Sequence, residues 1–166
     1  MIAREDLRHR FLSPQMTYYF HKKLAPLPPM EVDLRIEETL KFLNLAVYCE
    51  GAIPVSKEID DVWHYWVLET AEYEALCGKL PGGRFLHHTS NEYAEFHDPR
   101  AKDKDVDPAG QIAYLGAYVK NFGPFETGLV CHWPFASRLM HMFGWSLDEL
   151  NARLAACADQ PGDPKE

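Results

Sequence analysis

The chain has 166 residues, of which 46% are hydrophobic and 25% are charged, and its formal net charge is −8. This length and composition are typical of one globular domain with a full hydrophobic core. The acidic balance argues against nucleic-acid binding, which needs a basic surface to face the phosphates. No apolar run reaches the roughly 20 residues that a membrane-spanning helix requires, so no membrane partner is expected.

The cysteines are spread widely and form neither a C-x-x-C pair nor a zinc-finger pattern. They are Cys49, Cys77, Cys131 and Cys157. The first ten residues do not resemble a signal peptide, so we expect a soluble cytoplasmic protein whose cysteines are reduced.

Residues 1–30 are predicted to form a short helix followed by an arm. Three prolines lie within Ala25–Pro29, and this density favours a stiff, extended, polyproline-like segment. We therefore expect an N-terminal helix and arm, a single helical domain over 31–158, and a disordered tail over 159–166.

Two amphipathic helices are predicted next. The first covers about 32–49, and its apolar stripe carries Ile36, Leu40, Leu43 and Val47, with Glu37, Glu38 and Lys41 off the stripe. The second runs from Lys57 to about Cys77, between a capping Ser56 and Gly78, and is expected to be the central helix. Its apolar face would carry Ile59, Trp63, Trp66, Thr70, Tyr73 and Cys77.

A short helix is predicted over 90–96. Longer helices should begin after Asp107, Trp133 and Ser146, where a capping residue or a helix-opening proline precedes an apolar stripe. Residues 125–133 fit either an extended or a loop conformation. The sequence therefore predicts a compact all-α bundle of about six or seven helices with an extended Pro-rich N-terminal arm.

Residues with chemical potential cluster in the second helix and the turn after it. Asp60 and His64 are four positions apart and so share one face of the helix. The carboxylate can orient the imidazole, or both groups can bind one divalent metal, with zinc or iron the best match. His87 and His88 follow a glycine-rich turn that can return the chain to this helix. The surrounding pocket would be formed by Trp63, Trp66, Thr70 and Tyr73.

Structural alternatives apply to each of these residues. An aspartate–histidine pair one turn apart also stabilises ordinary helix surfaces. The two tryptophans lie on the apolar stripe and fit a core role. Cys77 is a weaker candidate as a nucleophile, because buried thiols are inert. Further histidines or carboxylates that could join a site are His97, Asp98 and His132.

The segment from Val55 to His88 carries a recognisable pattern. It reads Val-Ser-Lys-Glu-Ile-Asp-Asp-Val-Trp-His, then Thr70, Tyr73 and Cys77, then Gly-Arg-Phe-Leu-His-His. This pattern resembles the glycine-rich domain-containing protein-like family, and the similarity continues to about residue 123. The resemblance implies that Asp60, His64 and His88 form a site. It implies no particular reaction, because the family is largely of unknown function.

Two hypotheses of function follow. In the first, Asp60, His64 and His88 form a divalent-metal or acid–base site that acts on a small molecule. In the second, the chain is a non-catalytic domain that binds a partner protein, and the same residues form a hydrogen-bonded structural clasp. Whether the protein is an enzyme stays open at this stage. Both hypotheses require that the three side chains meet.

Overall fold

The computed structural model describes residues 4–48, 53–88 and 108–158. Over these ranges the chain forms eight α-helices and two short 3-10 turns and contains no strand. The elements are α1 (Arg4–Phe11), α2 (Pro14–Lys23), α3 (Pro29–Ala46), α4 (Lys57–Leu68), α5 (Thr70–Lys79), η1 (Pro81–Gly83), α7 (Pro108–Phe122), η2 (Val130–His132), α8 (Pro134–Phe143) and α9 (Leu147–Ala158). The all-α prediction is confirmed.

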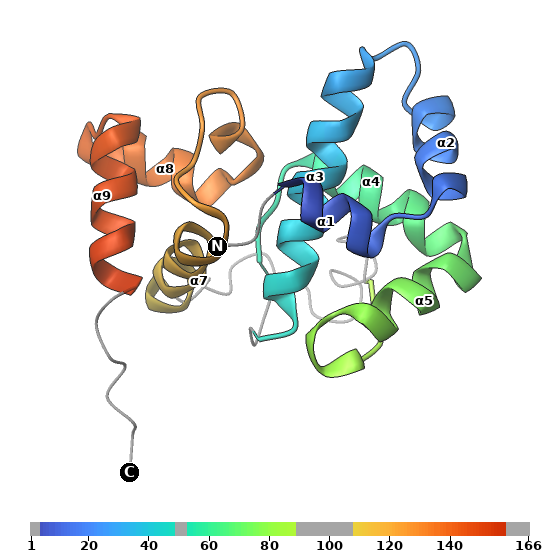
Figure 1. Cartoon of the computed structure of the whole chain (residues 1–166). Helices are drawn as coiled ribbons and strands as arrows, with labels where there is room; N and C mark the ends of the chain where they lie inside the picture. The colour runs from blue at the N-terminus through green and yellow to red at the C-terminus, as the bar shows by residue number, and fades with distance from the viewer. Residues whose placement is uncertain (1–3, 49–52, 89–107, 159–166) are drawn as a thin grey trace, which may run out of the picture.

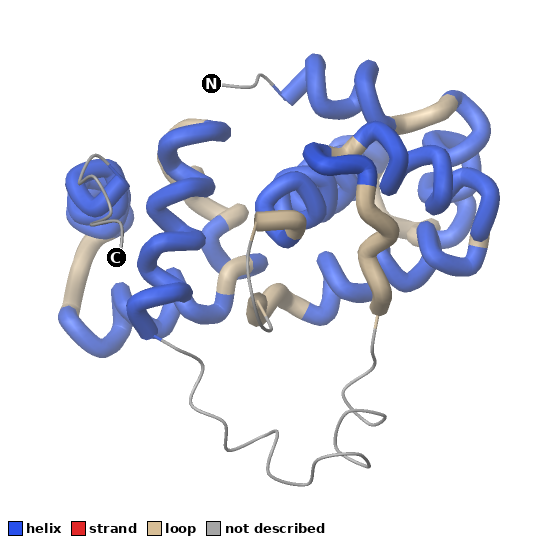
Figure 2. Tube along the Cα trace, turned by 90° about the horizontal axis from the view of Figure 1, so that it is seen from below, coloured by secondary structure: helices blue, strands red, loops and turns tan. Residues whose placement is uncertain are grey.

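The helices are arranged around α3 (Figures 1 and 2). Helices α1, α2, α4 and α5 lie on one side of α3, whereas α7, α8 and α9 lie on the other. Helix α3 contacts α1, α2, α4 and α7, and α7 in turn packs along α9. The central helix is therefore α3. The sequence had predicted that the helix beginning at Lys57 would be central, and that prediction is wrong.

Helix α3 is central because it is buried on every side along its second half. Every residue from Ile36 to Leu45 is buried, and the predicted stripe with Val47 is part of the core. A helix without an exposed face must pack between other elements. Polar residues therefore enter the interior with the apolar ones, among them Glu38 and Lys41.

Glu38 forms the main polar contact of the core. Its side chain is fully buried, and its carboxylate accepts hydrogen bonds from Lys41 Nζ at 2.7 Å and Trp133 Nε1 at 2.8 Å. The Tyr118 hydroxyl lies 3.0 Å from the same carboxylate and 2.9 Å from Lys41 Nζ. Buried charges are tolerated when they are paired and hydrogen-bonded in this way. The cluster joins α3, α7 and the residue before α8.

The N-terminal arm is shorter than predicted. Of the described residues before α3, helices α1 and α2 occupy most, and only 12–13 and 24–28 form non-helical connections. Pro14 and Pro29 each occupy the first position of a helix, where proline is favoured because no backbone donor is needed. Both N-terminal helices contribute to the same buried cluster as the rest of the chain, through Leu7, Phe11, Met16 and Phe20.

The predicted helix from Lys57 to Cys77 is wrong in one respect, because it is broken into α4 and α5. Glu69 leaves the helical conformation, with φ −92° and ψ 70°. In a straight helix, residues ten positions apart would be about 15 Å apart along the axis. The break instead lets Tyr73 of α5 reach Trp63 of α4.

Two coarser expectations concern membranes and thiols. No described helix is long and apolar enough to cross a membrane. Cys77, Cys131 and Cys157 are all free thiols, as predicted, with Cys77 buried and the other two exposed. Cys49, the predicted helix at 90–96 and the predicted tail at 159–166 lie outside the described residues.

Replacing Glu38 with alanine should destabilise the protein by about 3–5 kcal/mol, because the buried ammonium of Lys41 would lose its counter-charge. Urea unfolding followed by circular dichroism measures the loss. Glu31→Ala on the same helix is the matched control. Its ion pair with Arg35 is partly exposed and should contribute less than about 1 kcal/mol. Equal losses for the two variants would contradict a central role for Glu38.

Candidate functional site

The structure brings Asp60, His64 and His88 together. His88 Nε2 lies 3.1 Å from Asp60 Oδ1, which is hydrogen-bond distance. The centroids of the His64 and His88 rings are 5.2 Å apart. Asp60 and His64 come from α4, whereas His88 belongs to the segment that follows η1. We call this group, together with Trp63 and Tyr73, the clasp.

The turn after α5 directs the chain back toward α4. Gly82 and Gly83 adopt positive φ values of 79° and 60°, a region that glycine reaches without strain. Beyond this turn, Arg84 Nη2 donates a hydrogen bond of 2.8 Å to the Val47 carbonyl oxygen at the end of α3. The glycine-rich turn thus performs the chain reversal that the sequence predicted for it.

A chain of hydrogen bonds fixes the middle of the returning segment. Trp63 Nε1 donates to the Tyr73 hydroxyl at 2.9 Å, and that hydroxyl donates to the Leu86 carbonyl oxygen at 2.6 Å. Burial raises the pKa of Tyr73 well above its ordinary value, although the hydrogen bond from Trp63 acts in the opposite direction. The hydroxyl therefore stays protonated and remains a donor to Leu86.

The imidazole of His88 is largely enclosed. Its side chain is 10% exposed, whereas that of Asp60 is 49% exposed. The Trp63 ring meets it edge to face, with a centroid distance of 4.5 Å. When Nε2 carries the proton and donates to Asp60, Nδ1 keeps its lone pair. The pair has the form of a carboxylate that orients an imidazole.

The other predicted site residues do not join this pair. His87 is exposed and its ring lies against Phe85, 5.1 Å between centroids, because successive residues of an extended segment point to opposite sides. Trp66 packs into the core against Phe20 of α2, and its Nε1 has no hydrogen-bond partner. Thr70 is exposed at the start of α5, since the break at Glu69 removes it from the predicted face.

Among the described residues, no group of three or more histidine, cysteine, aspartate or glutamate side chains is placed to hold a metal ion. Asp60, His64 and His88 are neighbours, but the described contact is a hydrogen bond between two of them. His97 and Asp98, the additional candidate ligands, lie outside the described residues.

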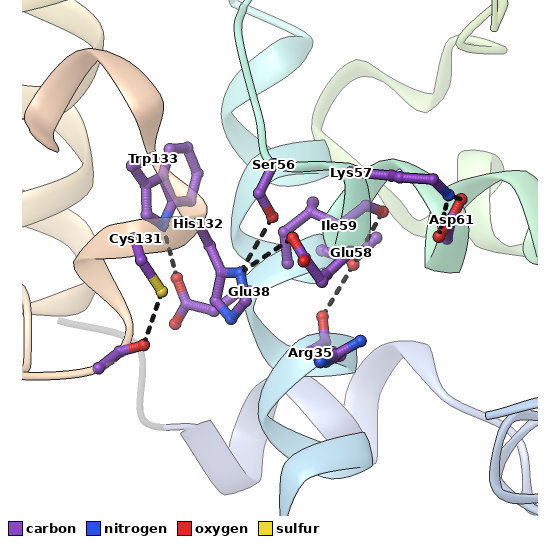
Figure 3. A network of polar contacts seen from close by, with 12 residues as sticks. Arg35, Glu38, Ser56, Lys57, Glu58, Ile59, Asp61, Cys131, His132 and Trp133 are labelled. Atoms are coloured by element: carbon purple, nitrogen blue, oxygen red, sulfur yellow. Dashed lines mark hydrogen bonds and ion pairs between the residues drawn. The ribbon is translucent and has the colours of Figure 1, made fainter. Parts of the chain in front are cut away.

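A second polar cluster, at the start of α4, was not predicted (Figure 3). The backbone N–H of Ser56 donates to the His132 carbonyl oxygen at 2.9 Å, and the Ser56 hydroxyl lies 3.0 Å from His132 Nδ1. Glu58 Oε2 is 4.0 Å from the same nitrogen. The hydrogen bond from Ser56 is the largest cause that holds the pKa of Glu58 below its ordinary value.

Sequence reasoning missed both this cluster and the one around Glu38. The spacing of Glu38 and Lys41 is visible in the sequence, but it is typical of a surface ion pair on any helix. Ser56 was assigned to helix capping, yet its side chain makes no capping hydrogen bond. Its partner His132 is 76 positions away, and no local pattern connects the two.

Comparisons with known proteins add no relative. No family model matches the chain, and no curated protein or solved structure matches it. The resemblance to the glycine-rich domain-containing protein-like family therefore stays a prediction from the motif at Val55–His88. The site has to be interpreted from its own geometry.

The lowered pKa of Glu58 predicts a specific pH dependence. A carboxylate whose pKa is lowered by folding stabilises the protein at pH values above its ordinary pKa of 4.5. This stabilisation is lost as the pH falls through the lower pKa of the folded state. Wild type should therefore exceed Glu58→Gln in unfolding free energy near neutral pH, with the difference shrinking between about pH 5 and pH 3. The side chain is 44% exposed, so the difference should stay below about 1 kcal/mol.

Urea unfolding at a series of pH values tests this dependence. Glu74→Gln, at an exposed position of α5, is the control and should show no such trend. A difference between wild type and Glu58→Gln that grows toward acid pH would contradict the assignment.

Proposed function

We propose that this protein is a non-catalytic interaction domain, in which the clasp fixes residues 84–88 on α4 and α5 for recognition by a partner protein. The observation that supports this most directly is the state of His88. Its Nε2 is bonded to Asp60, its ring is covered by Trp63, and its side chain is 10% exposed. The Nε2 atom of His88 is thus engaged in a contact within the protein.

Every second residue of the segment 84–88 is hydrogen-bonded to the rest of the protein. Arg84 is bonded to the end of α3, the Leu86 carbonyl oxygen to Tyr73, and His88 to Asp60. An extended segment presents successive side chains to opposite sides. Anchors at every second position therefore leave the side chains between them, at positions 85 and 87, directed outward.

Phe85 is the main feature of the outward side. It is 49% exposed, and its ring is held edge to face against Tyr73 at a centroid distance of 5.2 Å. The His87 ring also contacts it, at a centroid distance of 5.1 Å. An aromatic side chain that is already held in place loses little conformational entropy on binding, which favours recognition by a protein.

A divalent-metal or acid–base site is the second candidate. It is favoured by the exposed His64 ring beside His88 and by the half-exposed carboxylate of Asp60. Two imidazoles and a carboxylate suit zinc or iron. In this alternative the bound metal would polarise a small-molecule substrate or activate water, or Asp60 would orient His88 for proton transfer.

His88→Ala separates the two candidates. In the clasp, this variant should lower the unfolding free energy by about 1–3 kcal/mol, because a partly buried hydrogen bond and a ring contact are lost. The metal content, measured by elemental analysis of freshly purified protein, should be substoichiometric in wild type and unchanged in the variant. His87→Ala is the matched control and should leave the stability within about 0.5 kcal/mol of wild type.

The opposite pattern would establish the metal site. One equivalent of zinc or iron in wild type, lost in both His64→Ala and His88→Ala but kept in His87→Ala, would overturn the clasp. A His88→Ala variant with the same unfolding free energy as wild type would also count against the clasp.

Phe85→Ser tests the interaction surface. The variant should lose only about 1 kcal/mol of unfolding free energy, since the side chain is half exposed. It should lose a partner that wild type retains in chemical cross-linking from cell extract. Met142→Ser, at a more exposed apolar position on α8, is the control and should keep that partner. A partner retained equally by Phe85→Ser and wild type would contradict the proposed role of residues 84–88.

A further inference from the structure

A hollow lies where α1, the end of α3 and the end of α5 meet. It is open to solvent, has a volume of about 590 Å³, and shares no residue with the clasp. Its lining consists of Asp6, Arg10, Phe11, Asn44, Lys79, Leu80 and Pro81. Ligand pockets for small molecules commonly have volumes of about 300–1,000 Å³, so the hollow is large enough for a small organic ligand.

Two cations of the hollow have no described carboxylate partner. The guanidinium of Arg10 lies over the Phe11 ring at 5.5 Å and makes no ion pair within the described part of the chain. Lys79 likewise forms no described ion pair or hydrogen bond, although it closes the last turn of α5. Positive charge without a partner is notable in a chain with a net charge of −8. It favours a ligand with a carboxylate.

Asn44 supplies an acceptor from within the hollow. The residue is only 6% exposed, and its Nδ2 donates a hydrogen bond of 2.8 Å to the Leu40 carbonyl oxygen. Its Oδ1 has no described partner. Among the described residues, Trp66 Nε1 is the one side-chain polar atom that is both fully inaccessible and without a partner. Since Asn44 Oδ1 also has no described partner, it must be accessible, and it therefore reaches open space. A nearly buried amide oxygen that lines a hollow is suited to accept a hydrogen bond from a ligand N–H.

The remaining lining residues set the other properties of the ligand. Phe11 and Leu80 are nearly buried and offer an apolar floor. The carboxylate of Asp6 stands at the same hollow and disfavours ligands with several negative charges. One negative charge, one N–H donor and an apolar body together match these features.

We propose that this hollow binds a small carboxylate that carries an N–H group and an apolar side chain, such as an amino-acid derivative or a short peptide end. Arg10 and Lys79 bind the carboxylate, Asn44 Oδ1 accepts from the N–H, and Phe11 and Leu80 contact the apolar body. The site is independent of the clasp, because neither its residues nor its ligand chemistry involve Asp60 or His88.

Three related compounds probe the site. N-acetylphenylalanine has the carboxylate, the N–H and the ring; N-acetylphenylalaninamide lacks the charge, and 3-phenylpropanoate lacks the N–H. Titrations followed by two-dimensional ¹⁵N–¹H NMR should give saturable shifts around the hollow with N-acetylphenylalanine. The neutral amide should bind about tenfold more weakly or worse, and 3-phenylpropanoate several-fold more weakly.

The double variant Arg10→Gln/Lys79→Gln should weaken binding of N-acetylphenylalanine about tenfold or more. Both side chains are exposed, so the fold should be kept, as circular dichroism will verify. Lys22→Gln/Lys23→Gln on α2 removes the same charge elsewhere and should leave the affinity unchanged. The proposal is overturned by the absence of saturable shifts with wild type, by equal affinity for the acid and its amide, or by equal weakening in both double variants.

Discussion

The fully buried carboxylate of Glu38 is the constraint on which the arrangement of the helices depends. A charge removed from water must meet a counter-charge and hydrogen-bond donors, and these donors are directional in a way that apolar contacts are not. The donors here are Lys41 on the same helix, Tyr118 on α7 and Trp133 before α8. Apolar burial alone would permit several packings of these helices. Only a few of these packings let Glu38, Lys41, Tyr118 and Trp133 all form their hydrogen bonds.

The clasp depends on that arrangement through α4. Helix α4 packs along α3, and the two contacts between Ser56 and His132 attach its start to the loop that also carries Trp133. These contacts hold Asp60 and Trp63 in the position where they meet the segment 84–88. The short connection from Lys79 to His88 then borders both the hollow and the clasp.

Much of the local structure could be predicted because its causes lie within a few residues. Prolines at the start of α7 and α8 were correctly interpreted as helix openers. Ser146 caps α9 as expected, and its backbone N–H donates a hydrogen bond of 2.8 Å to the Glu149 carboxylate. The motif with Asp60 and His88 was also visible, because a helical spacing and a glycine turn together predict a chain reversal.

The sequence by itself determined the helical class and the starts of α4, α7, α8 and α9, since each follows from interactions between near neighbours. The approach of His88 to Asp60, 28 positions away, was predicted only through the glycine-rich turn between them. Only the tertiary structure decided which polar groups are buried. Glu38 and Trp133 are 95 positions apart, and no periodicity distinguishes a glutamate that will be enclosed from one that will face water. The break at Glu69 is of the same kind. It stands within a continuous helical pattern, and we relate it to the contact between Trp63 and Tyr73 that it permits.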